Sequence, residues 1–305
     1  MRGYILSRLR DALIAVWGVL TIVFVVLRLS GDPVILLLPV GATPEQAREL
    51  RHELGLDRPL PVQYWEFLRR VARGDFATSL RAGQPALGLV LERLPATGRL
   101  ALGALALACL VGGTAGILAA AYRGTVVELA AMGTALLGQA MPVFWLGILL
   151  ILVFGVQLRW LPAGGSETAR HMILPMVTLA AYSSASIARL LRSSLLEVLN
   201  QDYVRTARSK GLAGWVVLLR HALPNALLPV VTILGLQAGT LLGGSVITET
   251  IFAWPGVGRL AIQAIQNRDF PVVQAAVTVV AVTFVLINLL VDLLYAYIDP
   301  RVRFA

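Results

Sequence analysis

The segment DYVRTARSKGLAGWVVLLRHALPN, residues 202–225, contains the densest group of polar side chains in the sequence. Guanidinium and ammonium groups bind carboxylates and phosphates, so a helix that presents them can dock on an acidic partner. The same residues can also form an ordinary solvated loop, and the spacing alone leaves both interpretations open. The acidic and basic residues of the segment are Asp202, Arg205, Arg208, Lys210, Arg220 and His221.

The sequence contains no pattern that predicts catalysis by the chain alone. A P-loop needs a lysine followed by Ser or Thr to bind nucleotide phosphates and magnesium, but Lys210 is the only lysine and Gly211 follows it. The three histidines, His52, His171 and His221, lack the spacing of metal ligands. We therefore expect no enzyme, and no cofactor or metal bound by this chain.

The composition is that of a membrane protein. Hydrophobic residues make up 57% of the 305 residues and charged residues only 14%, whereas soluble proteins average about 25% charged residues. Pro142 interrupts one long apolar stretch, which predicts a kink or a late helix start there. Because a membrane span needs about 20 apolar residues, the sequence predicts an all-α integral membrane protein with six transmembrane helices, near 12–29, 98–122, 129–157, 172–191, 226–248 and 275–298.

The distribution of positive charge predicts the orientation. The net charge of +9 comes from residues between the apolar stretches, so we interpret it as a membrane-orientation signal and expect no nucleic-acid partner. Both termini and the loop 193–225 are placed in the cytoplasm, and the long loop 30–97 outside. The short loops on the outer side contain only Arg159, Arg170, Arg259 and Arg268.

The outer loop is expected to contain short helices. Thr43 is an N-cap candidate before Pro44, and Gly55 is a C-cap candidate. Residues 60–75, LPVQYWEFLRRVARGD, follow the helical period and predict an amphipathic helix. Its apolar face is expected to contain Tyr64, Trp65, Leu68 and Val71.

Residues 193–211, SSLLEVLNQDYVRTARSKG, are helical in pattern and end at Gly211, a typical C-cap residue. Positions three or four residues apart lie on one helical face, so Tyr203, Thr206 or Ala207, and Lys210 share a face. Ala207 is small, so the surface of another molecule could approach closely there. The pattern predicts a short helix across a hairpin between two spans.

Two further groups lie inside the predicted spans. Gly235, Gly239 and Gly243 recur every four residues and predict close helix packing. This packing could lie within the chain, against a second subunit or beside a solute path.

Asn288 and Asp292 share one face of the last span. A carboxylate at that depth needs a partner, and the leading candidates are Arg189 and Arg192 near the end of the fourth span.

The polar segment resembles the cytoplasmic signature of permease subunits of binding-protein-dependent ABC importers. Residues 203–212 read YVRTARSKGL, a form typical of the dipeptide, oligopeptide and nickel branch. Arg205 and Thr206 depart from the general Glu-Ala-Ala pattern. The residues in the signature's second Ala, Gly, Leu and Pro positions are Ala207, Gly211, Leu223 and Pro224. Further segments resemble the same branch, at 54–68, 74–97, 249–274 and 288–303.

The resemblance implies a type I ABC importer permease fold, with residues 1–305 as one permease domain in a bacterial or archaeal inner membrane. It implies a second permease subunit, like or unlike, an extracytoplasmic solute-binding protein, and two cytoplasmic ATPase subunits that bind ATP and magnesium. The helix at 202–210 would insert in a groove of one ATPase. The implied interface residues are Tyr203, Arg205, Thr206, Ala207, Lys210 and Gly211.

The resemblance favours a short peptide as the solute and leaves glutathione, nickel chelates and sugars open. A self-sufficient secondary transporter or channel is the alternative. Such transporters usually contain internal repeats and intramembrane ionisable residues, and in this sequence we find no repeat and few such residues.

Overall fold

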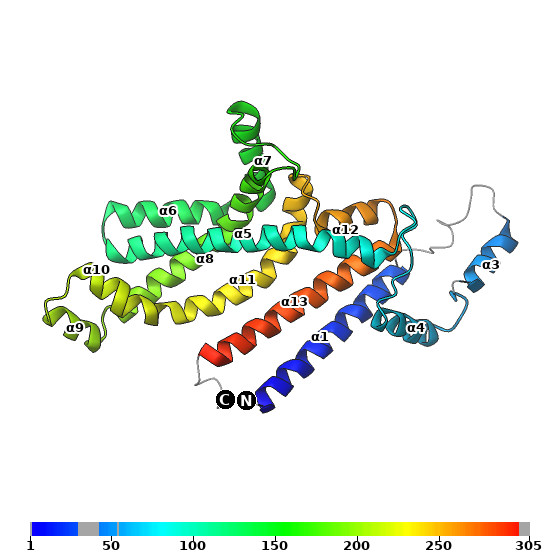
Figure 1. Cartoon of the computed structure of the whole chain (residues 1–305), viewed down its shortest axis with the longest axis horizontal. Helices are drawn as coiled ribbons and strands as arrows, with labels where there is room; N and C mark the ends of the chain where they lie inside the picture. Colours follow the sequence, from blue (N-terminus) through cyan, green and yellow to red (C-terminus); the bar gives the residue numbers. More distant parts are fainter. Residues whose placement is uncertain (1, 30–42, 54, 299–305) are drawn as a thin grey trace. The chain divides into compact units, whose positions relative to one another are not determined.

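The computed structural model describes residues 2–29, 43–53 and 55–298 (Figure 1). Within these ranges every regular element is helical, apart from one antiparallel bridge between Thr78 and Pro85. The chain forms two compact units. Unit 1 comprises Met1–Pro95 and Gly256–Leu286, and unit 2 comprises Ala96–Pro255 and Ile287–Ala305.

Unit 1 contains a long first helix and the helices of the predicted outer loop. Phe67 of α4 is buried against Leu20 and Phe24 of α1, and the Tyr64 hydroxyl lies 2.6 Å from that of Thr21. These contacts fasten α4 to the first span. The helices of this unit are α1 (Arg2–Leu29), α3 (Pro44–Glu53), α4 (Leu60–Ala72), α12 (Val257–Gln266), and the first parts of α5 (Ala86–Ala121) and α13 (Phe270–Ile298).

The predicted ends of α3 are confirmed. The Thr43 hydroxyl accepts a hydrogen bond from the Gln46 amide, and the Gln46 side chain accepts one from the Thr43 amide, which makes a capping box. Gly55 follows the helix with φ of +66°. The Leu56 amide then bonds to the Arg51 carbonyl, as in a Schellman motif. Local sequence therefore sets both ends of this helix.

The connection from α3 to α4 contains a contact between a histidine and a carboxylate. A His52 ring nitrogen lies 2.6 Å from the Asp57 carboxylate. The hydrogen bond from His52 holds the pKa of Asp57 below its usual range.

The amphipathic helix α4 is confirmed, with one correction to its apolar face. Tyr64, Leu68 and Val71 pack against the α1 cluster as predicted, but Trp65 is 68% exposed. Phe67 takes the central buried position instead. The helix is rotated so that Phe67, and not Trp65, faces α1. The helical period of the sequence does not distinguish these two rotations.

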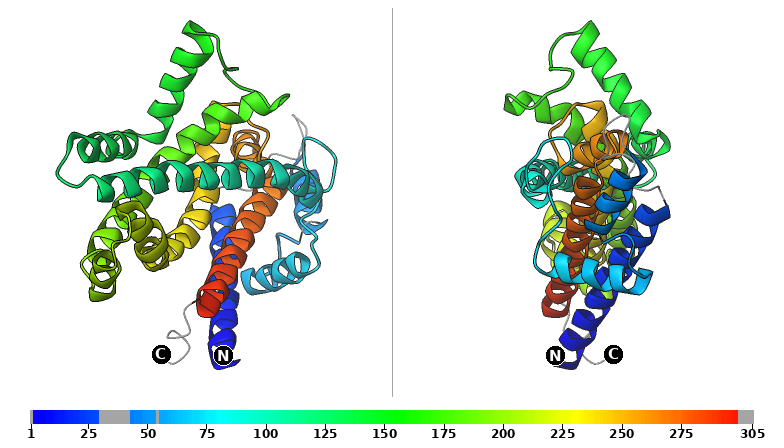
Figure 2. Two further views of the ribbon diagram at one scale, coloured as in Figure 1. Left: turned by 60° about the vertical axis from the view of Figure 1, so that its left-hand side comes forward. Right: turned by 90° about the vertical axis from the view of Figure 1, so that its right-hand side faces the viewer.

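Unit 2 is organised around α8 (Ile173–Val198), which packs against α6 (Val126–Ala140), α7 (Val143–Leu150) and α11 (Leu223–Ile251). Ile187, Leu191 and Leu195 form its buried stripe. Figure 2 shows the green-to-yellow segment that folds back between α8 and α11 at one end of both helices. The short elements of this unit are η1 (Ile151–Gln157), η2 (Ala169–Met172), α9 (Asp202–Ser209), α10 (Gly214–Val216) and η3 (Val217–Ala222).

The described helices agree with the predicted number of spans. Five are long and apolar enough to cross a membrane, and a sixth span results if the pair Val126–Ala140 and Val143–Gln157 counts as one. This pair bends by 106° at Pro142, where the break was predicted, because proline cannot donate the helical hydrogen bond. Helix α5 begins earlier than the predicted span and continues through Pro95.

Two glycines that the sequence analysis did not single out set the distance between α5 and α8. An added Cβ at Gly112 would lie 2.5 Å from the Ser184 carbonyl oxygen, and one at Gly116 would lie 2.9 Å from that of Ala188. Small residues four apart let helix backbones approach in this way. Gly113, between them, has no such neighbour within 4 Å.

We expect Gly112→Ala to destabilise unit 2, because the methyl group meets a backbone carbonyl that cannot rotate away. Overpacking of this kind costs about 1–3 kcal/mol. The measurement is thermal unfolding of the purified protein in detergent. Gly113→Ala is the control and should be neutral or slightly stabilising, since alanine favours the helix by about 0.5–1 kcal/mol. Equal melting temperatures for the two variants would contradict the close contact.

Candidate functional site

The polar segment folds as a short helix separated from the preceding span. Helix α8 ends at Val198 and α9 begins at Asp202, so the single helix predicted over 193–211 is wrong in its middle. Gln201 has extended backbone, with ψ of 153°, and the Asn200 side chain bonds back to the Leu196 carbonyl. Such local side-chain bonds compete with the helical ladder and turn the chain here.

The inner face of α9 packs on the chain itself. Val204 is fully buried and Ala207 is 7% exposed. Both belong to the cluster that contains Leu195 of α8 and Val217 of η3. The expectation that Ala207 leaves room for another molecule is therefore corrected, because its methyl group is covered by the chain's own loop. Only the tertiary fold decides which small residue of the helix faces inward.

The outer face of α9 is free of such contacts and carries positive charge. Arg205, Thr206 and Lys210 are exposed, as an interface would require. Arg205 lies 3.6 Å from Asp202, and both side chains are mostly exposed, so this pair contributes little to stability. The guanidinium and ammonium groups remain available to an acidic surface.

Tyr203 connects α9 to the next span. Its hydroxyl accepts a 2.7 Å hydrogen bond from the Asn225 side chain near the start of α11. The same hydroxyl lies 3.4 Å from the His221 carbonyl oxygen. Tyr203 is therefore an anchor within the chain as well as a partly exposed ring, which the helical spacing alone did not indicate.

Gly211 ends the short helix as predicted. Its φ of +76° lies in the left-handed region, and its amide bonds to the Arg208 carbonyl. A Cβ there would meet no atom within 4 Å. The cost of a side chain at this position is therefore conformational, about 1–2 kcal/mol for a residue other than glycine.

Sequence reasoning missed two apolar residues beside the charged face. Leu212 and Trp215 follow Gly211 and are 39% and 69% exposed. An exposed tryptophan next to cationic residues is typical of a protein interface. Their spacing of three, directly after a glycine, is the signal in the sequence that could have identified them.

We define the α9 surface as seven exposed residues of this segment. It consists of Tyr203, Arg205, Thr206, Lys210, Gly211, Leu212 and Trp215.

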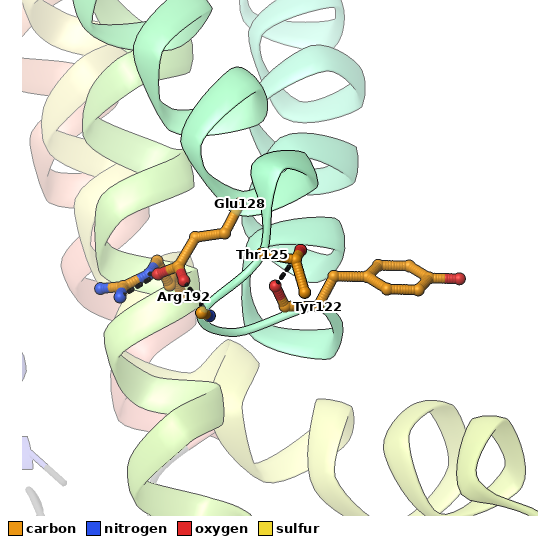
Figure 3. Close-up of polar contacts among 5 residues, drawn as sticks. Tyr122, Thr125, Glu128 and Arg192 are labelled. Carbon is orange, nitrogen blue, oxygen red and sulfur yellow. Dashed lines mark hydrogen bonds and ion pairs between the residues drawn. The ribbon is translucent and has the colours of Figure 1, made fainter.

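Within the spans, Arg192 has a different partner from the one expected. Its Nε donates a 2.7 Å hydrogen bond to Glu128 of α6, and the two groups form an ion pair (Figure 3). Glu128 also accepts a hydrogen bond from the Gly124 amide. The expectation that Arg192 pairs with Asp292 is therefore corrected. Glu128 was overlooked although it is an isolated acid within a long apolar stretch.

The remaining intramembrane candidates are placed as follows. Asn288 and Asp292 are half-buried on α13, and Arg189 is exposed on α8. Arg189 makes no hydrogen bond or ion pair with the residues that the structure describes, so its predicted pairing with Asp292 is not observed.

The three glycines of α11 predicted to pack closely, Gly235, Gly239 and Gly243, which we call the α11 stripe, have different surroundings. An added Cβ at Gly235 would lie 2.0 Å from a methyl carbon of Val291, so this glycine packs within the chain against α13. Gly239 is buried, whereas Gly243 is exposed and has no neighbour within 4 Å of an added Cβ. Only the Gly243 end remains open to a second subunit or a solute path.

These features define a polytopic membrane protein whose spans are joined by a helical loop with a charged outer face. The chain belongs to the family of the binding-protein-dependent transport system inner membrane component, which matches residues 112–304, and the family's N-terminal component matches residues 1–101. It is thus a multi-pass inner-membrane permease subunit of an ABC importer, and this family favours the importer over a self-sufficient secondary transporter or channel.

Relatives align over the full length of the chain. It is 40% identical to the dipeptide transport system permease protein of Alkalihalophilus pseudofirmus and 42% identical to the glutathione transport system permease protein of Pectobacterium atrosepticum, with 100% of each chain covered. The glutathione permease of Escherichia coli K12 is 41% identical, also over 100% of both chains.

Solved structures confirm the type I permease fold. An inward-facing methionine ABC transporter, MetNI, has a TM-score of 0.55 at 18% identity and covers 69% of this chain and 96% of that chain. An amino acid ABC transporter crystallised with histidines has a TM-score of 0.53 at 20% identity, with 70% and 94% covered.

We expect a double-mutant cycle on Glu128 and Arg192 to give a measurable coupling free energy, because both side chains are only partly exposed. The variants are Glu128→Gln, Arg192→Gln and their combination, measured by unfolding in detergent. The matched control is the exposed pair, with Asp202→Asn and Arg205→Gln, whose coupling should be near zero. Additive effects at both pairs would show that the α6–α8 ion pair contributes nothing.

Proposed function

We propose that this permease carries a short peptide, released from an extracytoplasmic binding protein, into the cytoplasm. The full-length relatives are named for a dipeptide and for glutathione, and glutathione is itself a short peptide. The shared chemistry of these solutes is a small chain with amide bonds and charged ends. Nickel chelates and sugars, which the sequence left open, are less consistent with these relatives.

The proposed orientation places both termini and the loop 193–225 in the cytoplasm and the loop 30–97 outside. It rests on the excess of basic residues in the cytoplasmic segments. The short helices α3 and α4 then lie on the side of the binding protein. Residues 30–42 and 54 of this loop lie outside the described residues.

The proposed motor site is the α9 surface. We assign it as the docking site for one of two cytoplasmic ATPase subunits, which bind the ATP and magnesium, because this chain has no P-loop lysine. The observation that carries the proposal is that α9 is fixed on one side and exposed on the other. Arg205 and Lys210 would complement acidic groups, and Trp215 would fill an apolar pocket.

The contacts of α9 explain how docking could move the spans. Val204 packs with Leu195 of α8, and Tyr203 bonds to Asn225 at the start of α11. A displacement of α9 by the ATPase would therefore reach both helices at once. Rigid-body motion of packed helices is one established form of alternating transition.

A second permease subunit, identical or different, completes the proposed importer. The exposed end of the α11 stripe at Gly243 is the part of this stripe that could face it or the solute path, since Gly235 is already covered by Val291.

We expect the double charge reversal Arg205→Glu, Lys210→Glu to weaken binding of the ATPase. Like charges brought together at an interface cost several kcal/mol, which corresponds to a loss of affinity of about a hundred-fold or more. The measurement is the amount of ATPase that co-purifies with the permease, together with ATP-dependent uptake in proteoliposomes.

The control for this experiment is Arg170→Glu, which reverses an exposed arginine at the other end of α8. It should leave ATPase binding unchanged. The reversals avoid the buried Ala207, where a large side chain would disturb the chain's own core. Wild-type binding by the double variant would contradict the assignment of the α9 surface, and ATP hydrolysis by the pure chain would contradict the separate motor.

We expect proteoliposomes with the permease pair, ATPases and loaded binding protein to accumulate a labelled dipeptide or glutathione only when ATP is inside. Excess unlabelled peptide should compete, and free nickel chelate or monosaccharide should not, because the relatives are named for peptides. Mass spectrometry of ligands retained by the natural binding protein provides an independent check. A retained sugar or nickel chelate would contradict the peptide assignment.

A further inference from the structure

A cavity of about 700 Å³ lies beside the start of α6 and the last turns of α8, outside the α9 surface. It is lined by Arg189, Arg192, Val126, Leu129, Glu128 and Thr125. The cavity therefore combines two arginines with an apolar wall. Its volume lies within the range of small-ligand sites, about 300–1,000 Å³.

The two arginines of this cavity are not equivalent. Arg192 is paired with Glu128, which also binds the Gly124 amide (Figure 3). Arg189 makes no hydrogen bond or ion pair with the residues that the structure describes. The charged residues that line the cavity are therefore two arginines and one glutamate, so the cavity is net positive.

The apolar wall of the cavity is open. Leu129 is 74% exposed and Val126 is 80% exposed, so both side chains face away from the protein core. A soluble anion would use only the arginine. A molecule with a negatively charged head and hydrocarbon tails would use both the guanidinium group and this wall.

The depth of the cavity fits the inner surface of a bilayer. Arg192 lies about 9 Å and Arg189 about 13 Å from Val198 along the axis of α8, at about 1.5 Å per residue. In the orientation proposed above, that helix end faces the cytoplasm. Arginine side chains extend toward the headgroups from such positions, and basic pockets between helices on this side bind anionic headgroups.

We propose that this cavity binds an anionic phospholipid, with the phosphate on Arg189 and an acyl chain along Val126 and Leu129. The Glu128–Arg192 ion pair holds α6 against α8 and so maintains the cavity, while Arg189 supplies the positive charge that the lipid neutralises. The inference uses the proposed orientation but requires no ATP, peptide or ATPase. Its test is therefore independent of transport.

The test exchanges the purified full-length chain from phosphatidylglycerol into a zwitterionic detergent and counts retained lipid by native mass spectrometry. We expect Arg189→Gln to retain about five-fold less phosphatidylglycerol, the effect of one arginine at an anionic surface. Arg189→Lys keeps the charge and should retain most of it. Arg170→Gln, the matched control at the other end of α8, should behave as wild type. Equal retention by Arg189→Gln and wild type would overturn the proposal.

Two further arms separate the lipid from other occupants. Glycerol phosphate in solution should not displace the retained lipid, and displacement would assign the cavity to a soluble anion instead. In the assembled importer, Leu129→Cys should react with a cysteine-directed lipid probe. A crosslink from this cysteine to the second permease would show that protein covers the wall, and would also overturn the proposal.

Discussion

The close packing of α8 is the constraint on which the rest of unit 2 depends. Backbone contact with α5 requires glycine at positions 112 and 116, because a side chain there would overlap the Ser184 and Ala188 carbonyl groups. In lipid there is no hydrophobic force between helices, so such contacts supply much of the association. The buried residues of α8 then pack against α11 and against the loop that contains α9.

This arrangement makes α8 the natural element to transmit motion. Its last turn contributes Leu195 to the cluster that holds Val204 of α9. The side chain of Asn225 connects the same short helix to α11 through the Tyr203 hydroxyl. A helix that is well packed on one face and charged on the other can receive force from a partner without unfolding. The proposed ATPase coupling depends on this asymmetry more than on any single residue.

Several polar side chains inside unit 2 are placed in pairs. The buried Glu249 accepts a 2.7 Å hydrogen bond from the Thr97 hydroxyl, and Gln237 accepts one from Ser183. Together with the Glu128–Arg192 ion pair, these contacts join helices that are distant in sequence. Because an unsatisfied polar group is costly in hydrocarbon, each pair also selects one relative position of its two helices.

The sequence by itself determined the features that depend on local chemistry. Apolar length predicted the spans, Pro142 predicted the break between α6 and α7, and Thr43 and Gly55 predicted the ends of α3. Gly211 was assigned correctly because a left-handed residue after a helix strongly favours glycine. The resemblance of several segments to importer permeases also came from the sequence. Several motifs in the same order can identify a family, whereas composition alone cannot.

The tertiary structure alone decided which residues meet across the fold. Ala207 faces inward, Trp65 faces outward, Arg192 pairs with Glu128, and the close contact between α5 and α8 uses Gly112, which lies outside the α11 stripe. Each of these depends on the rotation and register of one helix against another. Helical periodicity places residues on a common face, but it does not specify what that face contacts, because the partner is supplied by a distant part of the chain.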